Sequence, residues 1–236
     1  MDRLSMPRIL CVLLTALPLL VAACGPAGDA LPEVAHGTSA SATTEAERDT
    51  SLPRIVFLGD SLTAGLGLPR EEAVPALIQA RLDAEGYAYE AVNAGVSGGT
   101  AAGGLSRLDW SLEGNAAILV VELGANDGLR GLPVSQLRHN LSEIITRAEQ
   151  RGVTVILTGM EAPPNYGAVY TSEFRQVFRG LADEYDVTFV PFFLEGVAGV
   201  PSLNNADGMH PNSAGAQIVA ETVWQVLEPV IEAQTQ

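Results

Sequence analysis

The sequence is poor in positive charge. Its 236 residues include 13 Lys and Arg residues against 28 Asp and Glu residues, which gives a formal net charge of -15. Nucleic-acid binding needs a basic surface for the phosphates, so this balance argues against a nucleic-acid partner. It also disfavours adhesion to anionic lipid through charge alone. Hydrophobic residues make up 47% of the chain, which is enough for a large core in one domain of ordinary size.

The apolar run near the N-terminus is short. It covers residues 9–23, and these 15 residues fall below the roughly 20 that a membrane-spanning helix needs. Arg3 and Arg8 precede the run, and small residues end it in "LVAAC", directly before Cys24. This arrangement indicates an N-terminal targeting segment, which takes no part in the fold.

Cysteine is scarce, with only Cys11 and Cys24 in the chain. The residues before Cys24 resemble the lipobox of bacterial lipoprotein signal peptides, in which the cysteine is lipidated and becomes the mature N-terminus. This resemblance predicts a signal peptide over 1–23 and lipid attachment at Cys24. The alternative is a plain secretory signal cleaved nearby, with Cys24 incidental. Because Cys11 lies in the segment predicted to be removed, the mature chain would have no internal disulfide.

Hydrophobic periodicity is missing between Cys24 and residue 51. This stretch is rich in Ala, Thr, Ser and Gly, a composition typical of a flexible tether. At about 5–6 Å × √n its typical span would be roughly 30 Å. We therefore expect an exported protein whose folded domain, residues 52–236, is held near a membrane by the lipid. A soluble periplasmic or secreted protein is the alternative.

From residue 52 onward, short apolar runs alternate with helical patterns. Strands are predicted over 54–58, 89–93, 116–124, 153–159 and 187–192, and helices over 74–86, 133–152, 171–185 and 213–234. This alternation predicts an α/β fold, a three-layer α/β/α sandwich with a central parallel five-stranded sheet of the flavodoxin-like kind. Ligands bind beyond the carboxyl ends of the strands in such folds, so we expect the chemistry in the loops that follow them.

Histidine is scarce as well, and only one of the three lies in a loop of this type. His36 is in the predicted tether, and His139 is on the polar side of a predicted helix. His210 lies in "DGMHPN" before the last predicted helix, with Asp207 three residues earlier to orient its ring. Ser61, in "FLGDSLTAG" after the first strand, needs such a base to act as a nucleophile. The predicted catalytic set is therefore Ser61, His210 and Asp207.

Each of these residues also has an ordinary explanation. A serine in a Gly-Asp-Ser turn is more often a helix N-cap than a nucleophile. An Asp three residues before a His in a loop is more often a solvent-exposed residue without a catalytic role. The prediction depends on finding both motifs at the two ends of one α/β domain.

Two further loops follow predicted strands. Gly95, in "NAGVSGGT", lets the backbone approach a substrate closely and offer its N–H group. A phosphate-binding loop or a flexible turn is the alternative, although a dinucleotide fingerprint would want its glycines directly after the first strand. Asn126, in "GANDG", can direct its amide NH2 group at a developing oxyanion. The alternative for Asn126 is a turn former.

In this order, "GDSLTAG", the Gly95 loop, "GANDG" and "DGMHPN" resemble the four blocks of the SGNH hydrolases, also called the GDSL esterase/lipase family. "FLGDSLTAGLGL" and "EAPPNYG" further resemble its bacterial thioesterase, lysophospholipase and arylesterase branch, and the resemblance covers residues 53–232. It implies acyl transfer to water through a serine ester, without metal or cofactor. Ser61, Gly95 and Asn126 would be the oxyanion-hole donors, and small-molecule or lipid acyl esters the substrates.

Two other functions stay open at this point. A carbohydrate O-acetyl esterase carries the same four blocks, although "GLGLP" and "EAPPNYGAVY" favour apolar acyl groups. A non-catalytic envelope lipoprotein that binds a ligand or partner could use this fold, although it would have little reason to keep every catalytic residue type.

Overall fold

The computed structural model describes residues 52–235. The predicted signal peptide, Cys24 and the tether lie outside the described residues, so they remain predictions. Within the described part, no helix combines the length and the apolar character that crossing a bilayer would require.

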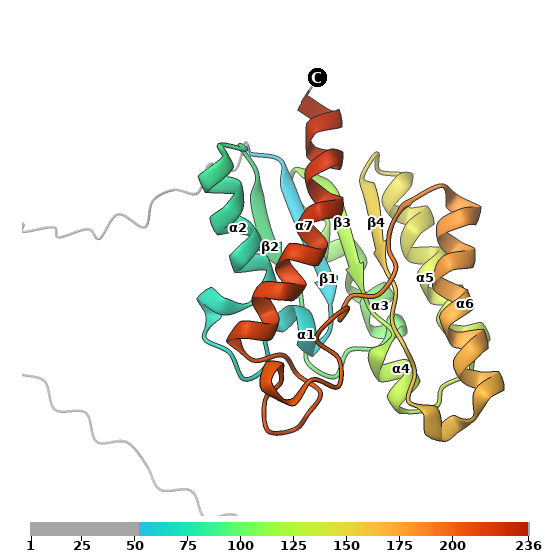
Figure 1. The fold of residues 1–236 in the computed structure, drawn as a ribbon. Helices are drawn as coiled ribbons and strands as arrows, with labels where there is room; N and C mark the ends of the chain where they lie inside the picture. Colours follow the sequence, from blue (N-terminus) through green and yellow to red (C-terminus); the bar gives the residue numbers. More distant parts are fainter. Residues whose placement is uncertain (1–51, 236) are drawn as a thin grey trace, which may run out of the picture. The chain divides into compact units, whose positions relative to one another are not determined.

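A five-stranded sheet forms the centre of the domain (Figure 1). Its strands are β1 (Arg54–Gly59), β2 (Glu90–Asn93), β3 (Ala116–Glu122), β4 (Thr154–Thr158) and β5 (Thr188–Val190). Every neighbouring pair is parallel, and the order is β2-β1-β3-β4-β5. This confirms the predicted flavodoxin-like sheet. The order reverses between β1 and β3, which is where such sheets place their ligands.

Helices cover both faces of the sheet. They are α1 (Ser61–Ala64), α2 (Val74–Glu85), α3 (Ala101–Ser111), α4 (Ala125–Leu129), α5 (Val134–Glu149), α6 (Ala168–Tyr185) and α7 (Ser213–Thr235), with short 3-10 turns η1 (Arg70–Glu72), η2 (Pro164–Tyr166) and η3 (Pro201–Leu203). Helix α2 packs against α7 in one layer, whereas α3, α5 and α6 pack side by side in the other (Figure 1). The chain changes direction along the sheet after β2, and crossovers of one hand then place the helices before and after this point on opposite faces.

Helix α3 was not predicted from the sequence. Two glycines in "AAGGLSRLDWS" lower its helix propensity. The helix begins nevertheless at Thr100, whose side chain accepts a hydrogen bond from the Gly103 N–H group. Gly104 faces the core so closely that a Cβ atom there would lie 2.2 Å from Leu123 Cδ1. The glycine that weakens the helical pattern is thus the residue that lets α3 pack on the sheet.

Strand β3 is buried from Ile118 onward, as its apolar sequence predicts, and only its first two residues are partly exposed. Ile118, Leu119, Val120 and Val121 are each 0% exposed. The same buried run ends in an acidic residue, Glu122, which is also 0% exposed. A carboxyl group in this place was not anticipated from the sequence.

The start of α7 lies unusually close to the loop that precedes it. A Cβ atom at Gly215 would stand 2.1 Å from the Leu203 carbonyl oxygen, and that loop carries the predicted catalytic histidine. Gly180, in α6, has only a flexible Arg138 side-chain atom near its Cβ position, at 3.6 Å. Glycine is therefore needed for packing at the first position and not at the second.

We expect Gly215→Ala to destabilise the domain by about 1–3 kcal/mol, since backbone must move to accept the methyl group. Gly180→Ala is the matched control and should stabilise it by about 0.5–1 kcal/mol, because alanine loses less entropy in a helix. Chemical denaturation of the two variants measures both values. Equal effects would contradict the close contact at Gly215.

Candidate active site

Ser61 directly follows the sharp turn that Asp60 makes between β1 and α1. It is the first residue of α1 and is 8% exposed. Asp60 caps this helix: its Oδ1 accepts a hydrogen bond from the Leu62 N–H group at 3.0 Å. The turn therefore fixes the backbone on both sides of Ser61 and leaves its hydroxyl at the carboxyl end of the sheet.

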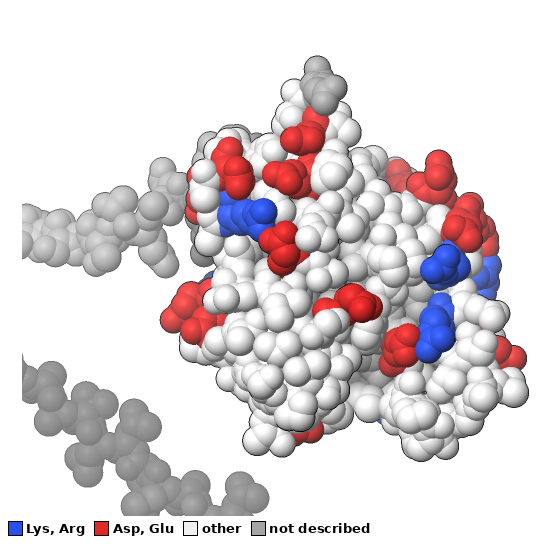
Figure 2. Space-filling model, in the orientation of Figure 1, with Lys and Arg blue, Asp and Glu red and all other residues white. Residues whose placement is uncertain are grey.

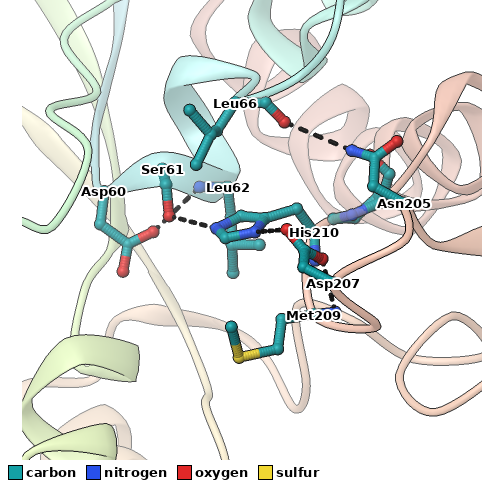
Figure 3. A network of polar contacts seen from close by, with 9 residues as sticks. Asp60, Ser61, Leu62, Leu66, Asn205, Asp207, Met209 and His210 are labelled. Carbon is teal, nitrogen blue, oxygen red and sulfur yellow. Dashed lines mark hydrogen bonds and ion pairs between the residues drawn. The ribbon is translucent and has the colours of Figure 1, made fainter.

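His210 reaches Ser61 from the other end of the chain. Its Nε2 lies 2.9 Å from Ser61 Oγ, and its Nδ1 lies 2.7 Å from Asp207 Oδ2 (Figure 3). The structure thus brings together the three predicted catalytic residues in the order Ser61, His210, Asp207. This is the arrangement of a nucleophile, a base and the carboxylate that orients the base.

The loop itself keeps Asp207 ionised. The Asp207 Oδ1 atom accepts hydrogen bonds from the backbone N–H groups of His210 at 3.0 Å and Met209 at 2.9 Å. These bonds, with that of the His210 ring, lower the pKa of Asp207 to about 2. A carboxylate beside Nδ1 favours the tautomer with its proton on Nδ1, which leaves the Nε2 lone pair free to accept the Ser61 hydroxyl proton.

Asn126, the second residue of α4, lies beside this group, and its amide is already anchored. Its Nδ2 donates to Asp60 Oδ2 at 2.9 Å and to the Gly99 carbonyl at 3.1 Å. Burial raises the pKa of Asp60, whereas the hydrogen bonds from Leu62 and Asn126 lower it. Through the hydrogen bonds that it accepts from Leu62 and Asn126, Asp60 joins the turn before Ser61 to the predicted oxyanion donor.

Gly95 does not line the cavity beside Ser61, where the sequence predicts an oxyanion-hole donor. Its N–H group donates to Asn93 Oδ1 at 3.0 Å, and a Cβ atom at Gly95 would lie 2.4 Å from the backbone nitrogen of Ala64. Gly95 thus packs behind α1 instead of facing Ser61. The glycine of this loop that lines the cavity beside Ser61 and Asn126 is Gly98.

Gly98 was missed because the loop contains several glycines and its path cannot be inferred from spacing. Its φ of +78° is one that glycine adopts most readily, and its carbonyl accepts a hydrogen bond from Arg130 at 2.9 Å. Within residues 52–235, the backbone N–H groups of Gly98 and Ser61 have no hydrogen-bond partner. Both are therefore available to a ligand.

A largely apolar cavity of about 710 Å³ opens at Ser61 and His210. Its other lining residues are mostly nonpolar and include Leu66, Leu129, Met160, Pro163, Phe192 and Met209. Leu66, Leu129 and Met209 are each about half exposed, so the rim is apolar as well. In Figure 2 the surface at the lower end of the domain, to which the strands point, is mostly uncharged.

The chain is similar to a family model and to several known proteins. Residues 57–218 match the model of the GDSL-like lipase/acylhydrolase family. Esterase TesA of Pseudomonas aeruginosa is 45% identical over 178 residues, covering 75% of this chain and 89% of that protein. Thioesterase 1/protease 1/lysophospholipase L1 of Escherichia coli (strain K12) is 34% identical over 185 residues, covering 78% and 88%.

A solved structure titled as the crystal structure of TesA superposes with a TM-score of 0.72 at 45% identity, covering 75% of this chain and 98% of that one. The family match extends over more than half of the chain and includes Ser61, Asn126, Asp207 and His210. The chain therefore belongs to the GDSL-like lipase/acylhydrolase family and is a serine hydrolase of acyl esters.

Proposed function

We propose that Ser61 Oγ attacks the carbonyl carbon of the ester while His210 Nε2 takes its proton. The Asp207 carboxylate stabilises the imidazolium that forms. His210 then donates the proton to the leaving alcohol or thiol, and water, activated by the same base, hydrolyses the acyl-serine ester. The observation that carries this proposal is the continuous Ser61–His210–Asp207 hydrogen-bond chain.

For the oxyanion hole we propose the Ser61 and Gly98 N–H groups together with Asn126 Nδ2. The two backbone groups are unpartnered in the described part of the chain, and both residues line the cavity with Asn126. The Asn126 amide would share one N–H with the oxyanion while its bond to Asp60 keeps it in place. Donors fixed before the reaction stabilise the developing charge without reorganisation.

The cavity supports apolar acyl esters or thioesters as substrates in preference to acetylated carbohydrates. Its lining offers few polar groups besides the catalytic ones, and a sugar would need several hydrogen-bond partners when buried. An apolar acyl chain, in contrast, gains about 0.8 kcal/mol for each buried CH2 group.

We expect kcat/KM to rise along a series of p-nitrophenyl esters from acetate to hexanoate, because each added CH2 group finds apolar surface in the cavity. The soluble domain is assayed with each ester and with matching acyl thioesters. Ser61→Ala should lower every rate by roughly 10³-fold or more while the fold is kept. A strict preference for acetate would favour the carbohydrate O-acetyl esterase, and full activity of Ser61→Ala would exclude the mechanism.

Asn126→Ala should lower kcat by about 10²–10³-fold, the usual cost of one oxyanion-hole donor. Asn126 also anchors Asp60, so circular dichroism and the melting temperature must show that the variant is folded. Asn165→Ala is the control, since Asn165 lies outside the cavity lining in the nearby turn η2, and it should leave kcat unchanged. A loss below threefold at Asn126 would show that it only shapes the turn.

We also propose that the protein is exported and anchored to a membrane through a lipid on Cys24. The support is the sequence alone: an apolar run with basic residues before it and small residues directly before Cys24. Mass spectrometry of the N-terminal peptide from native protein should find a diacylglyceryl-modified cysteine, and Cys24→Ala should leave the protein in the soluble fraction. An unmodified N-terminus near this position would indicate a plain secretory signal.

A further inference from the structure

A buried carboxyl group lies directly behind the nucleophile turn. Glu122 ends β3 and pairs with Gly59 of β1, two residues before Ser61. Its side chain is fully buried, and its Oε1 atom has no hydrogen-bond partner within residues 52–235. The mechanism proposed above makes no use of this group, although buried unpartnered carboxyl groups are rare and costly.

The other oxygen of Glu122 holds the turn on both sides of Ser61. Glu122 Oε2 accepts a hydrogen bond from the Asp60 N–H group at 3.2 Å and another from Thr63 Oγ1 at 2.9 Å. A Cβ atom at Gly59 would lie 2.7 Å from this oxygen and 2.0 Å from Thr63 Oγ1. Glycine at that position is therefore what allows the carboxyl group to reach the turn.

The surroundings of Glu122 favour its neutral form. Burial raises the pKa of Glu122 well above its usual range and the negative charge of Asp60 raises it further, which outweighs the hydrogen bonds from the Asp60 N–H group and Thr63 that lower it. The cation facing this region is Arg107 of α3, which donates from Nη2 to the Gly59 carbonyl at 2.6 Å and to the Ala94 carbonyl at 3.4 Å. Burial lowers the pKa of Arg107, whereas the charges of Asp60 and Glu122 raise it; no ion pair between Arg107 and Glu122 within 4.0 Å is found in the described part of the chain.

We propose that Glu122 is a positioning residue for the nucleophile, acting as a neutral carboxylic acid that accepts hydrogen bonds from Asp60 and Thr63 and so fixes Ser61 Oγ within reach of His210. The proposal rests on Ser61 being the nucleophile. Glu122 does not touch Ser61, and its effect passes through the backbone. Errors of about 1 Å in the placement of reacting groups cost up to roughly 10²-fold in rate.

Thr63→Val tests one of the two hydrogen bonds with little change of shape. We expect kcat for p-nitrophenyl butyrate to fall about tenfold with KM unchanged, because misplacement of the nucleophile affects the chemical step and not substrate binding. Thr158→Val is the matched control. Thr158 is equally buried and donates to the Val121 carbonyl at 3.0 Å, one residue before Glu122, so it should lower the melting temperature but not kcat.

Glu122→Gln and Glu122→Leu separate the hydrogen bond from the charge. Glutamine keeps a neutral acceptor, so kcat should stay within about threefold of wild type, whereas leucine leaves both donors unpartnered and should lower kcat about tenfold or more. Wild-type kcat in Glu122→Leu and Thr63→Val would overturn the proposal. A loss of kcat in Glu122→Gln as large as that in Glu122→Leu would contradict the neutral form of Glu122. If Glu122→Leu does not fold, the comparison of Thr63→Val with Thr158→Val, together with Glu122→Gln, tests the proposal.

The pH dependence of stability gives a readout independent of catalysis. A neutral buried acid contributes stability that is complete below its unfolded-state pKa of about 4.3 and is lost as pH rises toward the raised folded value. The difference in melting temperature between wild type and Glu122→Gln should therefore become smaller as the pH is raised from 4.5 to 8. A difference that grows or stays constant over this range would contradict a neutral Glu122. Failure of the proposed function would appear separately, as wild-type protein that neither hydrolyses the ester nor reacts with a fluorophosphonate.

Discussion

The Asp60 carboxyl group is the contact on which the rest of the site depends. One of its oxygens accepts from the backbone of α1 and the other from the side chain of Asn126 in α4. These two loops follow β1 and β3, the strands between which the order of the sheet reverses. The nucleophile and the predicted oxyanion donor are thereby held relative to each other through one side chain. A site divided over several loops needs such links, because the loops share no backbone hydrogen-bond ladder.

The proximity of Ser61, His210 and Asp207 could be predicted because their residue types are rare or their motifs distinctive. With three histidines in the chain, only His210 lay in a loop after a strand, and Asp207 stood where its carboxyl could reach the ring. The parallel sheet was predictable for a similar reason, since β3 is a long apolar run between helical patterns. These predictions need only residue identity and spacing, which the sequence supplies directly.

The residues that were missed depend on backbone paths and packing instead. Gly95 and Gly98 are both glycines of the same loop, so residue type does not distinguish them. Only the path of the loop determines that Gly95 packs against α1 and that Gly98 lines the cavity. Glu122 was hidden at the end of an apolar strand, where its burial follows from the close approach of Gly59. Helix α3 was overlooked because the glycine that it needs for packing also weakens its helical pattern.

The Asp207–His210 pair has a consequence for acid tolerance. Asp207 is held ionised by backbone N–H groups of its own loop, and its side chain is 42% exposed, so neither a closed cavity nor a bound substrate is needed to keep its charge. Because the pKa of Asp207 is about 2, its carboxylate stays ionised in mildly acidic solution. An acid limb of the rate profile at higher pH therefore reports a group other than Asp207, because the Asp207 carboxylate keeps its charge and its hydrogen bond to the His210 ring through that range.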